Sequence, residues 1–184
     1  MKNILLSFIL FSFIFANAQS STPEIVNYAA KKNIGKVQWC IKKGHDINAK
    51  SRSKWTALAY AVKNKDYKMV KILLENDANT EIYISTRETP LLLACKYNYT
   101  NIAKLLIQYK ADVKFEDIVE FTSLQWAAKY GNKELVELLL ANGAEINHKN
   151  VNGRTALDVA ATNISGYLKS KGAKTGKQLY DEKH

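Results

Sequence analysis

The residues of this 184-residue sequence that could do metal, redox or nucleophilic chemistry are few and scattered. There are two cysteines, Cys40 and Cys95, and three histidines, His45, His148 and His184. No metal-ligand spacing joins the histidines to one another or to the cysteines. A glycine-rich phosphate loop, a nucleophile elbow and a recurring carboxylate pair are also missing from the sequence. These observations argue against an enzyme and indicate neither a cofactor nor a metal.

A repeat of 33 residues organises the chain around these side chains. Residues 122–147 contain a short helix opened by Thr122, a Gly131-Asn132 break and a second, leucine-rich helix that ends at Gly143-Ala144. Three residue types recur at the same interval of 33: Thr56, Thr89, Thr122 and Thr155; Leu58, Leu91, Leu124 and Leu157; Ala61, Ala94, Ala127 and Ala160. Recurrence of three side chains in four successive repeats indicates one structural unit that is stacked several times.

This pattern resembles the ankyrin repeat, in which a turn is followed by two antiparallel helices. Residues 89–94, Thr-Pro-Leu-Leu-Leu-Ala, are similar to the family's Thr-Pro-Leu-His-x-Ala opening. The resemblance implies an all-α ankyrin-repeat solenoid of about five helix-turn-helix repeats joined by β-hairpin-like turns. We place the domain at residues 19–173, with repeats near residues 21–53, 54–86, 87–119, 120–152 and 153–173.

The sequence departs from the family pattern in its turns and at its C-terminal end. Gly153 supplies the usual turn glycine in the last turn, but the other three inter-repeat turns lack it. In the last repeat, Lys171-Gly172-Ala173 arrives four residues earlier than the period requires. This shift predicts a second helix shortened by about one turn, which suits a terminal repeat. Residues 174–184 are polar and basic, and we expect a disordered tail.

The register also bears on the two cysteines. Cys40 aligns with Leu73, Leu106 and Leu139, and Cys95 aligns with Val62 and Ala128, so both occupy core positions. One whole repeat separates them, whereas a disulfide needs Cα atoms about 4.4–6.8 Å apart. We therefore expect two buried free thiols.

Residues 1–18 have the composition of a secretory signal peptide. Lys2 precedes an apolar run from Ile4 to Phe15, and Ala16-Asn17-Ala18 forms a small-x-small cleavage site before Gln19. The run is shorter than the roughly 20 residues of a membrane-spanning helix. We expect cleavage near Ala18-Gln19, a periplasmic or secreted mature chain, and no transmembrane segment in it.

The formal net charge of +10 comes almost entirely from lysine, since only Arg52, Arg87 and Arg154 are arginines. Recognition of phosphates or bases favours the planar arginine fork over the flexible lysine point charge. The composition therefore favours a solvated lysine surface over a specific nucleic-acid site. We expect a monomer that binds a protein partner.

In the ankyrin family, partners usually bind the concave face, made by the turns and the outer positions of each first helix. Carried over by position, this face predicts eleven partner-binding residues: Arg52, Trp55, Lys63, Glu88, Lys96, Tyr97, Ile118, Phe121, Lys129, Tyr130 and Arg154. Exposed aromatic rings are common hot spots of protein interfaces. The alternative for any single ring is that it packs over a neighbouring turn.

The leading hypothesis from the sequence is an exported, non-catalytic scaffold that binds a protein partner, as an inhibitor or immunity protein or as an accessory protein. A charge-driven binder of acidic polymer or of an anionic membrane surface is the alternative. A secreted, host-directed effector is a third reading of the same signal peptide. Salt separates the first two, because exposed charge interactions are screened and apolar contacts are not.

Overall fold

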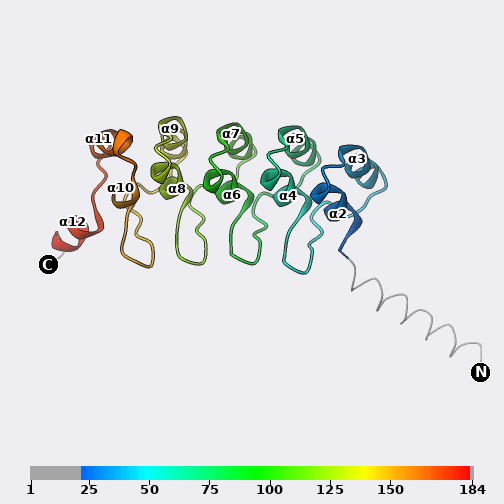
Figure 1. Cartoon of the computed structure of the whole chain (residues 1–184), viewed down its shortest axis with the longest axis horizontal. Helices are drawn as coiled ribbons and strands as arrows, with labels where there is room; N and C mark the ends of the chain where they lie inside the picture. Colours follow the sequence, from blue (N-terminus) through cyan, green and yellow to red (C-terminus); the bar gives the residue numbers. More distant parts are fainter. Residues whose placement is uncertain (1–21, 183–184) are drawn as a thin grey trace, which may run out of the picture.

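The computed structural model describes residues 22–182, and this part of the chain is all-helical, without a strand. Five helix pairs stand side by side in one row, and the turns between them project from one side of the row (Figure 1). The first helices of the pairs are α2 (Glu24–Ala30), α4 (Ala57–Lys63), α6 (Pro90–Lys96), α8 (Ser123–Lys129) and α10 (Ala156–Val159). The second helices are α3 (Ile34–Lys42), α5 (Tyr67–Glu75), α7 (Thr100–Gln108), α9 (Lys133–Ala141) and α11 (Thr162–Ser170). The predicted helical solenoid is confirmed.

The recurring threonines begin the first helices. The Thr56 hydroxyl accepts a hydrogen bond from the Ala59 amide at 3.1 Å, and Thr89 and Thr122 accept equivalent bonds at 3.3 Å. Each bond satisfies one of the amides that a helix leaves without a partner in its first turn. The threonine period therefore sets where α4, α6 and α8 begin.

The core runs along the row between the helix pairs. Each first helix contacts the next one, from α2 to α4, α6, α8 and α10. Ala61, Ala94 and Ala127 are fully buried, and the small side chain permits this close approach. Leu91, Leu106 and Leu124 fill the layers between the pairs. Each repeat is thus stabilised by its neighbours, as in other linear repeat arrays.

The turns keep one geometry although most of them lack glycine. In each turn the same two backbone hydrogen bonds recur, for example Ile84 N to Glu88 O at 3.0 Å and Arg87 N to Ile84 O at 2.9 Å. Lys54, Arg87 and Glu120 adopt the positive φ that Gly153 adopts in the last turn. The turns resemble hairpins in this bonding, and the described residues contain a single isolated bridge, between Glu116 and Thr122.

The last repeat differs from the expectation. Helix α11 has nine residues, like the other second helices, and the shortened element is α10, with four. Ala160 is extended, with φ −63° and ψ 139°, so the chain leaves the first helix before its second turn is complete. The prediction of a shortened second helix was wrong: α10 has four residues where α8 has seven, and the link to the second helix is one residue shorter.

The C-terminal segment is also more ordered than predicted. Helix α12 (Gly176–Asp181) follows α11, and two hydrogen bonds dock its start onto the last repeat. The Thr155 hydroxyl donates to the Lys174 carbonyl at 2.7 Å, and the Gly176 amide donates to the Asp158 carboxylate at 2.7 Å. The expectation of disorder for residues 174–184 was therefore wrong for the described part, up to Glu182. The open end of the last repeat supplies the partners of this helix.

Cys40 and Cys95 are buried and free, in repeats one and three as the register predicted. Residues 1–21, which include the predicted signal peptide, and residues 183–184 lie outside the described residues. Among the helices of residues 22–182, none is long and apolar enough to cross a membrane.

Candidate binding face

The eleven predicted partner-binding residues lie on the turns and first helices, or directly after the helices. One recurring position immediately precedes each threonine cap and holds Trp55, Glu88, Phe121 and Arg154. The last residue of three first helices is a lysine, Lys63, Lys96 and Lys129. We call the surface made by these two positions and the turn tips the turn–helix face. It is built from one backbone motif used four times.

Repeat two carries a cluster of two rings and a lysine on this face. Trp55 and Tyr60 have ring centroids 4.8 Å apart, at 36° between their planes. The Lys63 ammonium lies 4.9 Å from the Trp55 ring centroid, within range of a cation–π contact. Both rings are half-buried, so each packs on the repeat and still offers an edge to solvent.

Repeat four carries two rings and a lysine at the same three positions, two periods later, but here the lysine lies over the ring within the helix. Phe121 and Trp126 have ring centroids 4.6 Å apart, and Tyr130 stacks on Trp126 at 6.3 Å. The Lys129 ammonium lies 4.8 Å from the Trp126 ring, and the Lys96 ammonium reaches the same ring from repeat three at 5.5 Å. Trp126 therefore joins two repeats through one ring.

Repeat three has an ion pair where its neighbours have rings. Glu88 is buried, with 4% of its surface exposed, and its carboxylate accepts a 2.5 Å bond from Lys96 and another from the Thr86 hydroxyl. Burial opposes the charge on Lys96, but the hydrogen bond from its ammonium to Glu88 prevails and raises the pKa of Lys96. Glu88 thus lies beneath the turn–helix face, where it holds Lys96, and its own side chain is not available to a partner.

The turn tips and the last repeat supply a more polar margin. Ile118 is exposed at the tip of its turn, with 64% of its surface accessible, and Arg52 is exposed at the first turn. Arg154 is also exposed and donates to the Asp158 carbonyl at 3.1 Å. Tyr97 pairs with Tyr99 at 5.6 Å, beyond the end of α6. These residues flank the two ring clusters.

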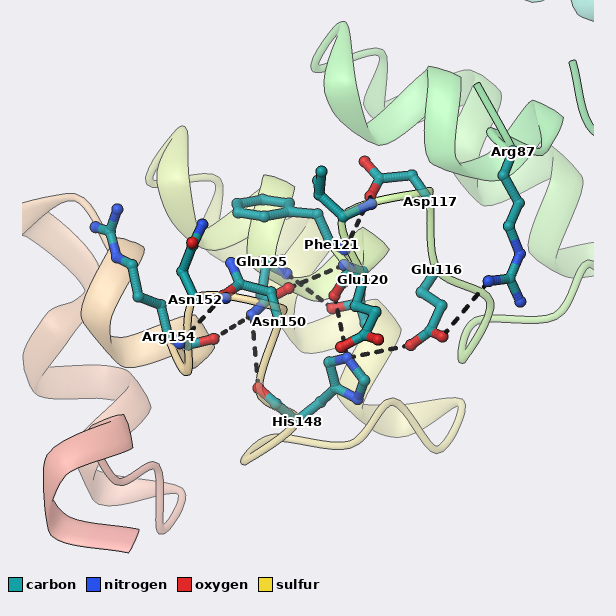
Figure 2. A network of polar contacts seen from close by, with 12 residues as sticks. Arg87, Glu116, Asp117, Glu120, Phe121, Gln125, His148, Asn150, Asn152 and Arg154 are labelled. Atoms are coloured by element: carbon teal, nitrogen blue, oxygen red, sulfur yellow. Dashed lines mark hydrogen bonds and ion pairs between the residues drawn. The ribbon is translucent and has the colours of Figure 1, made fainter. Parts of the chain in front are cut away.

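A network beside the face links three successive repeats. Figure 2 shows Glu116 between Arg87, at 3.8 Å, and the His148 ring, at 3.3 Å. His148 Nε2 also lies 3.1 Å from the Glu120 carbonyl oxygen, and Gln125 donates to the Arg154 carbonyl at 2.7 Å (Figure 2). Side chains from neighbouring repeats thus fix the turns relative to one another, so the face is a continuous surface.

Two residues of the face were missed by the sequence reasoning, Tyr60 and Trp126. The sequence does contain a pattern that identifies them. Trp55-x4-Tyr60 and Phe121-x4-Trp126 are the same motif of two aromatic residues, 66 residues apart, and a lysine follows each motif three residues later. Position 93, between them in the period, is leucine, so the motif is found only by comparing alternate repeats.

Three potential metal ligands lie close together in the first repeat, although no ligand spacing in the sequence pointed to them. In residues 22–182, Glu24, Cys40 and His45 offer ligand atoms that all lie within 4.8 Å of one another. Burial, and then the nearby Glu24 carboxylate, raise the pKa of the Cys40 thiol, while Lys36 opposes the shift. Burial raises the pKa of Cys95 to about 12, so that thiol is a core residue and not a nucleophile.

Comparison with known families agrees with the geometry. The family described as ankyrin repeats in three copies matches residues 26–117, and the family described as ankyrin repeats in many copies matches residues 124–165. The chain belongs to the ankyrin repeat family. No protein among the curated sequences matches it. Ankyrin repeats generally mediate protein–protein interaction and are typically non-catalytic scaffolds.

Proposed function

We propose that the chain is an exported, non-catalytic binding protein that captures a protein partner on its turn–helix face. The observation that carries the proposal is the pair of matched ring-and-lysine clusters in repeats two and four. Packing alone does not require them, since repeat three fills the same backbone positions with Glu88, Leu93 and Lys96. Aromatic rings beside cations are typical of interface hot spots.

The spacing of the two ring-and-lysine clusters indicates what kind of partner would fit the turn–helix face. The rings of repeats two and four lie on either side of repeat three, and Lys96 occupies the stretch between them. A partner segment with two apolar anchors separated by an acidic or polar stretch complements this order. Export of the chain is part of the proposal and is supported by the charge, length and cleavage pattern of residues 1–18. In that compartment an inhibitor, an immunity protein or an accessory protein would each need such a face.

The test is capture of a partner from the exported fraction by the purified protein, compared with the double variant Trp55→Ala/Phe121→Ala. We expect the variant to weaken binding by at least about 2 kcal/mol, roughly 30-fold in Kd. The matched control is Tyr67→Ala/Tyr109→Ala, which removes two exposed rings from the second-helix side of the row. Equal loss in both double variants, or no loss in the first with its fold intact, would contradict the proposal.

A charge-driven binder of acidic polymer or of an anionic membrane surface is the second candidate. It is favoured by the three lysines at one position of successive repeats, Lys63, Lys96 and Lys129, and by the net charge of +10. Such binding should weaken steeply with salt and should tolerate Trp55→Ala/Phe121→Ala. Binding that survives high salt and fails in the ring variant selects the protein partner. A host-directed effector would share the same face, and the identity of the captured partner distinguishes it.

A further inference from the structure

The first repeat contains a group of side chains that the binding function does not use. Glu24 lies in the first turn of α2, Cys40 lies near the end of α3, and His45 follows that helix. One ligand atom from each lies within 4.8 Å of the other two, and His45 Nδ1 is 3.7 Å from a Glu24 oxygen. Cys40 is fully buried, whereas Glu24 and His45 are in part accessible to solvent. The group therefore has a buried sulfur below and two solvent-facing ligands above.

The backbone fixes two of the three residues relative to each other. Helix α3 ends in a glycine motif, in which Gly44 has a φ of 76° and the His45 amide donates to the Cys40 carbonyl at 3.0 Å. This bond is the long bond of a Schellman motif, and it holds the residue after the glycine over the last turn of the helix. The Trp39 ring lies 5.5 Å from the His45 ring and flanks it.

The same three positions in the other repeats hold packing residues. The equivalents of Glu24, Cys40 and His45 are Ala57, Leu73 and Ala78 in repeat two; Pro90, Leu106 and Ala111 in repeat three; and Ser123, Leu139 and Ala144 in repeat four. Leu73, Leu106 and Leu139 are fully buried. Repeat one thus replaces a leucine–alanine packing contact with a thiol and an imidazole, and adds a carboxylate beside them. A terminal repeat could expose polar residues at its open end, but that would not require a buried cysteine.

We propose that Glu24, Cys40 and His45 bind a divalent transition-metal ion of the Zn²⁺ class. A thiolate, an imidazole and a carboxylate form a donor set that suits Zn²⁺, and a water molecule can complete the tetrahedron. Bonds of about 2.0–2.3 Å to a tetrahedral ion place its ligand atoms roughly 3.3–3.7 Å apart. The 3.7 Å between Glu24 and His45 lies at the upper end of this range, and any of the other separations that is longer, up to 4.8 Å, would have to shorten on binding. On binding, the ion replaces the thiol proton of Cys40, and the proton passes to solvent.

Such an ion would tie together three segments of the first described repeat: the start of α2, the end of α3 and the turn after α3 (Figure 1). An ion that binds only the folded state stabilises it in proportion to its occupancy. We therefore expect Zn²⁺ to raise the melting temperature of the protein, and the rise to vanish when the ligands are replaced.

The experiment titrates the reduced, purified protein with Co²⁺ alone and then with Zn²⁺ as competitor. We expect one Co²⁺ per chain, a thiolate-to-cobalt charge-transfer band, and quenching of Trp39 fluorescence, all reversed by Zn²⁺. Cys40→Ser should remove the band. Glu24→Gln and His45→Gln should each weaken binding by at least the roughly 10-fold that loss of an outer-shell partner costs. Trp39→Phe should abolish the fluorescence quenching and leave the thiolate-to-cobalt charge-transfer band unchanged.

Controls keep the outcome decisive if Cys40→Ser is poorly folded. Cys95→Ser removes the other buried thiol and should leave Co²⁺ binding unchanged. Glu24→Gln and His45→Gln change accessible side chains, and circular dichroism checks that their helix content is retained. The absence of saturable one-to-one binding, or a band that persists in Cys40→Ser, overturns the proposal. Unchanged affinity in either accessible-ligand variant overturns the three-ligand site.

Discussion

Repeats three and four place different chemistry on the same backbone. At three equivalent positions, repeat three has Glu88, Leu93 and Lys96, and repeat four has Phe121, Trp126 and Lys129. In repeat three the lysine neutralises a buried carboxylate, whereas in repeat four it lies against a ring. The ankyrin scaffold accepts both arrangements because the threonine cap and the helix core lie elsewhere. The turn–helix face is therefore where the repeats can differ without loss of the fold.

The two repeats are nevertheless coupled through Lys96. Its ammonium pairs with Glu88 in its own repeat and lies 5.5 Å from the Trp126 ring of the next. A buried carboxylate requires such a partner, because an unpaired charge in the protein interior is costly. A ring does not, since burial of its apolar surface is favourable by itself. We expect substitutions in repeat three to act mainly on stability and those in repeat four mainly on binding.

The largest difference in stability and in binding between repeats three and four should come from substitutions at Leu93 and at its equivalent, Trp126. Leu93→Ala opens a cavity at a residue with 1% exposure and should lower the free energy of unfolding by about 3 kcal/mol. Trp126→Ala removes a half-buried ring and should cost less, about 2 kcal/mol. Urea denaturation measures both values. Partner capture is assayed under conditions in which both variants are folded. It should fail for Trp126→Ala and survive for Leu93→Ala. The opposite result would show that repeat four is not part of the binding face.

The next contrast lies in the lysines of the two repeats. Lys96→Met leaves the buried Glu88 carboxylate without its cation and should cost about 1–2 kcal/mol, below the 3–5 kcal/mol of a fully buried pair because the lysine is partly solvated. Lys129→Met loses one exposed cation–π contact and should cost about 0.5 kcal/mol. Similar losses in the two variants would show that the Glu88 pair contributes no more than a surface contact.

The pH dependence of this difference follows from the raised pKa of Lys96. A lysine whose pKa is higher in the folded than in the unfolded state binds its proton more tightly when folded. Its stabilising effect is complete below the ordinary lysine value of 10.5 and is lost as the pH rises through the higher folded value. The difference in unfolding free energy between the native protein and Lys96→Met should therefore be constant at neutral pH. It should narrow only above pH 10.5. A difference that already narrows between pH 6 and pH 8 would show that a group other than Lys96 causes it.

The repeat architecture could be predicted from the sequence because its causes are local and recur. Thr56, Leu58 and Ala61 each act within one helix pair, through a cap, a filled layer and a close approach. Two refinements did not follow from the repeat pattern. Glu88 is buried and paired with Lys96 at a position where the other repeats have a half-buried ring or an exposed arginine, and α10 is cut short where Ala160 turns away from the helix.

The candidate sites were predicted less completely than the fold, for the same physical reason. Trp126 became part of the face through rings and lysines from two repeats. Cys40 and His45 are five residues apart, at positions that hold leucine and alanine in repeats two to four, and the glycine turn at Gly44 brings the imidazole back over the thiol. Docking of α12 depends on Thr155 and Asp158, whose bonding to the tail follows from the open end of the last repeat.

The smallest contrast lies in the turns that precede α6 and α8. Arg87 and Glu120 occupy equivalent positions with φ near 60°, a conformation that costs a residue with a Cβ roughly 1–2 kcal/mol. Glu120→Gly relieves this strain but increases the entropy of the unfolded chain, so we expect a net gain of about 0.5 kcal/mol. Arg87→Gly should gain nothing, because it also removes the contacts of the guanidinium with Glu116 and with the Phe115 ring. Gly153→Ala, at the equivalent glycine, is the control and should lower the urea midpoint. A loss of stability in Glu120→Gly would show that its side chain contributes more to the turn than its backbone conformation costs.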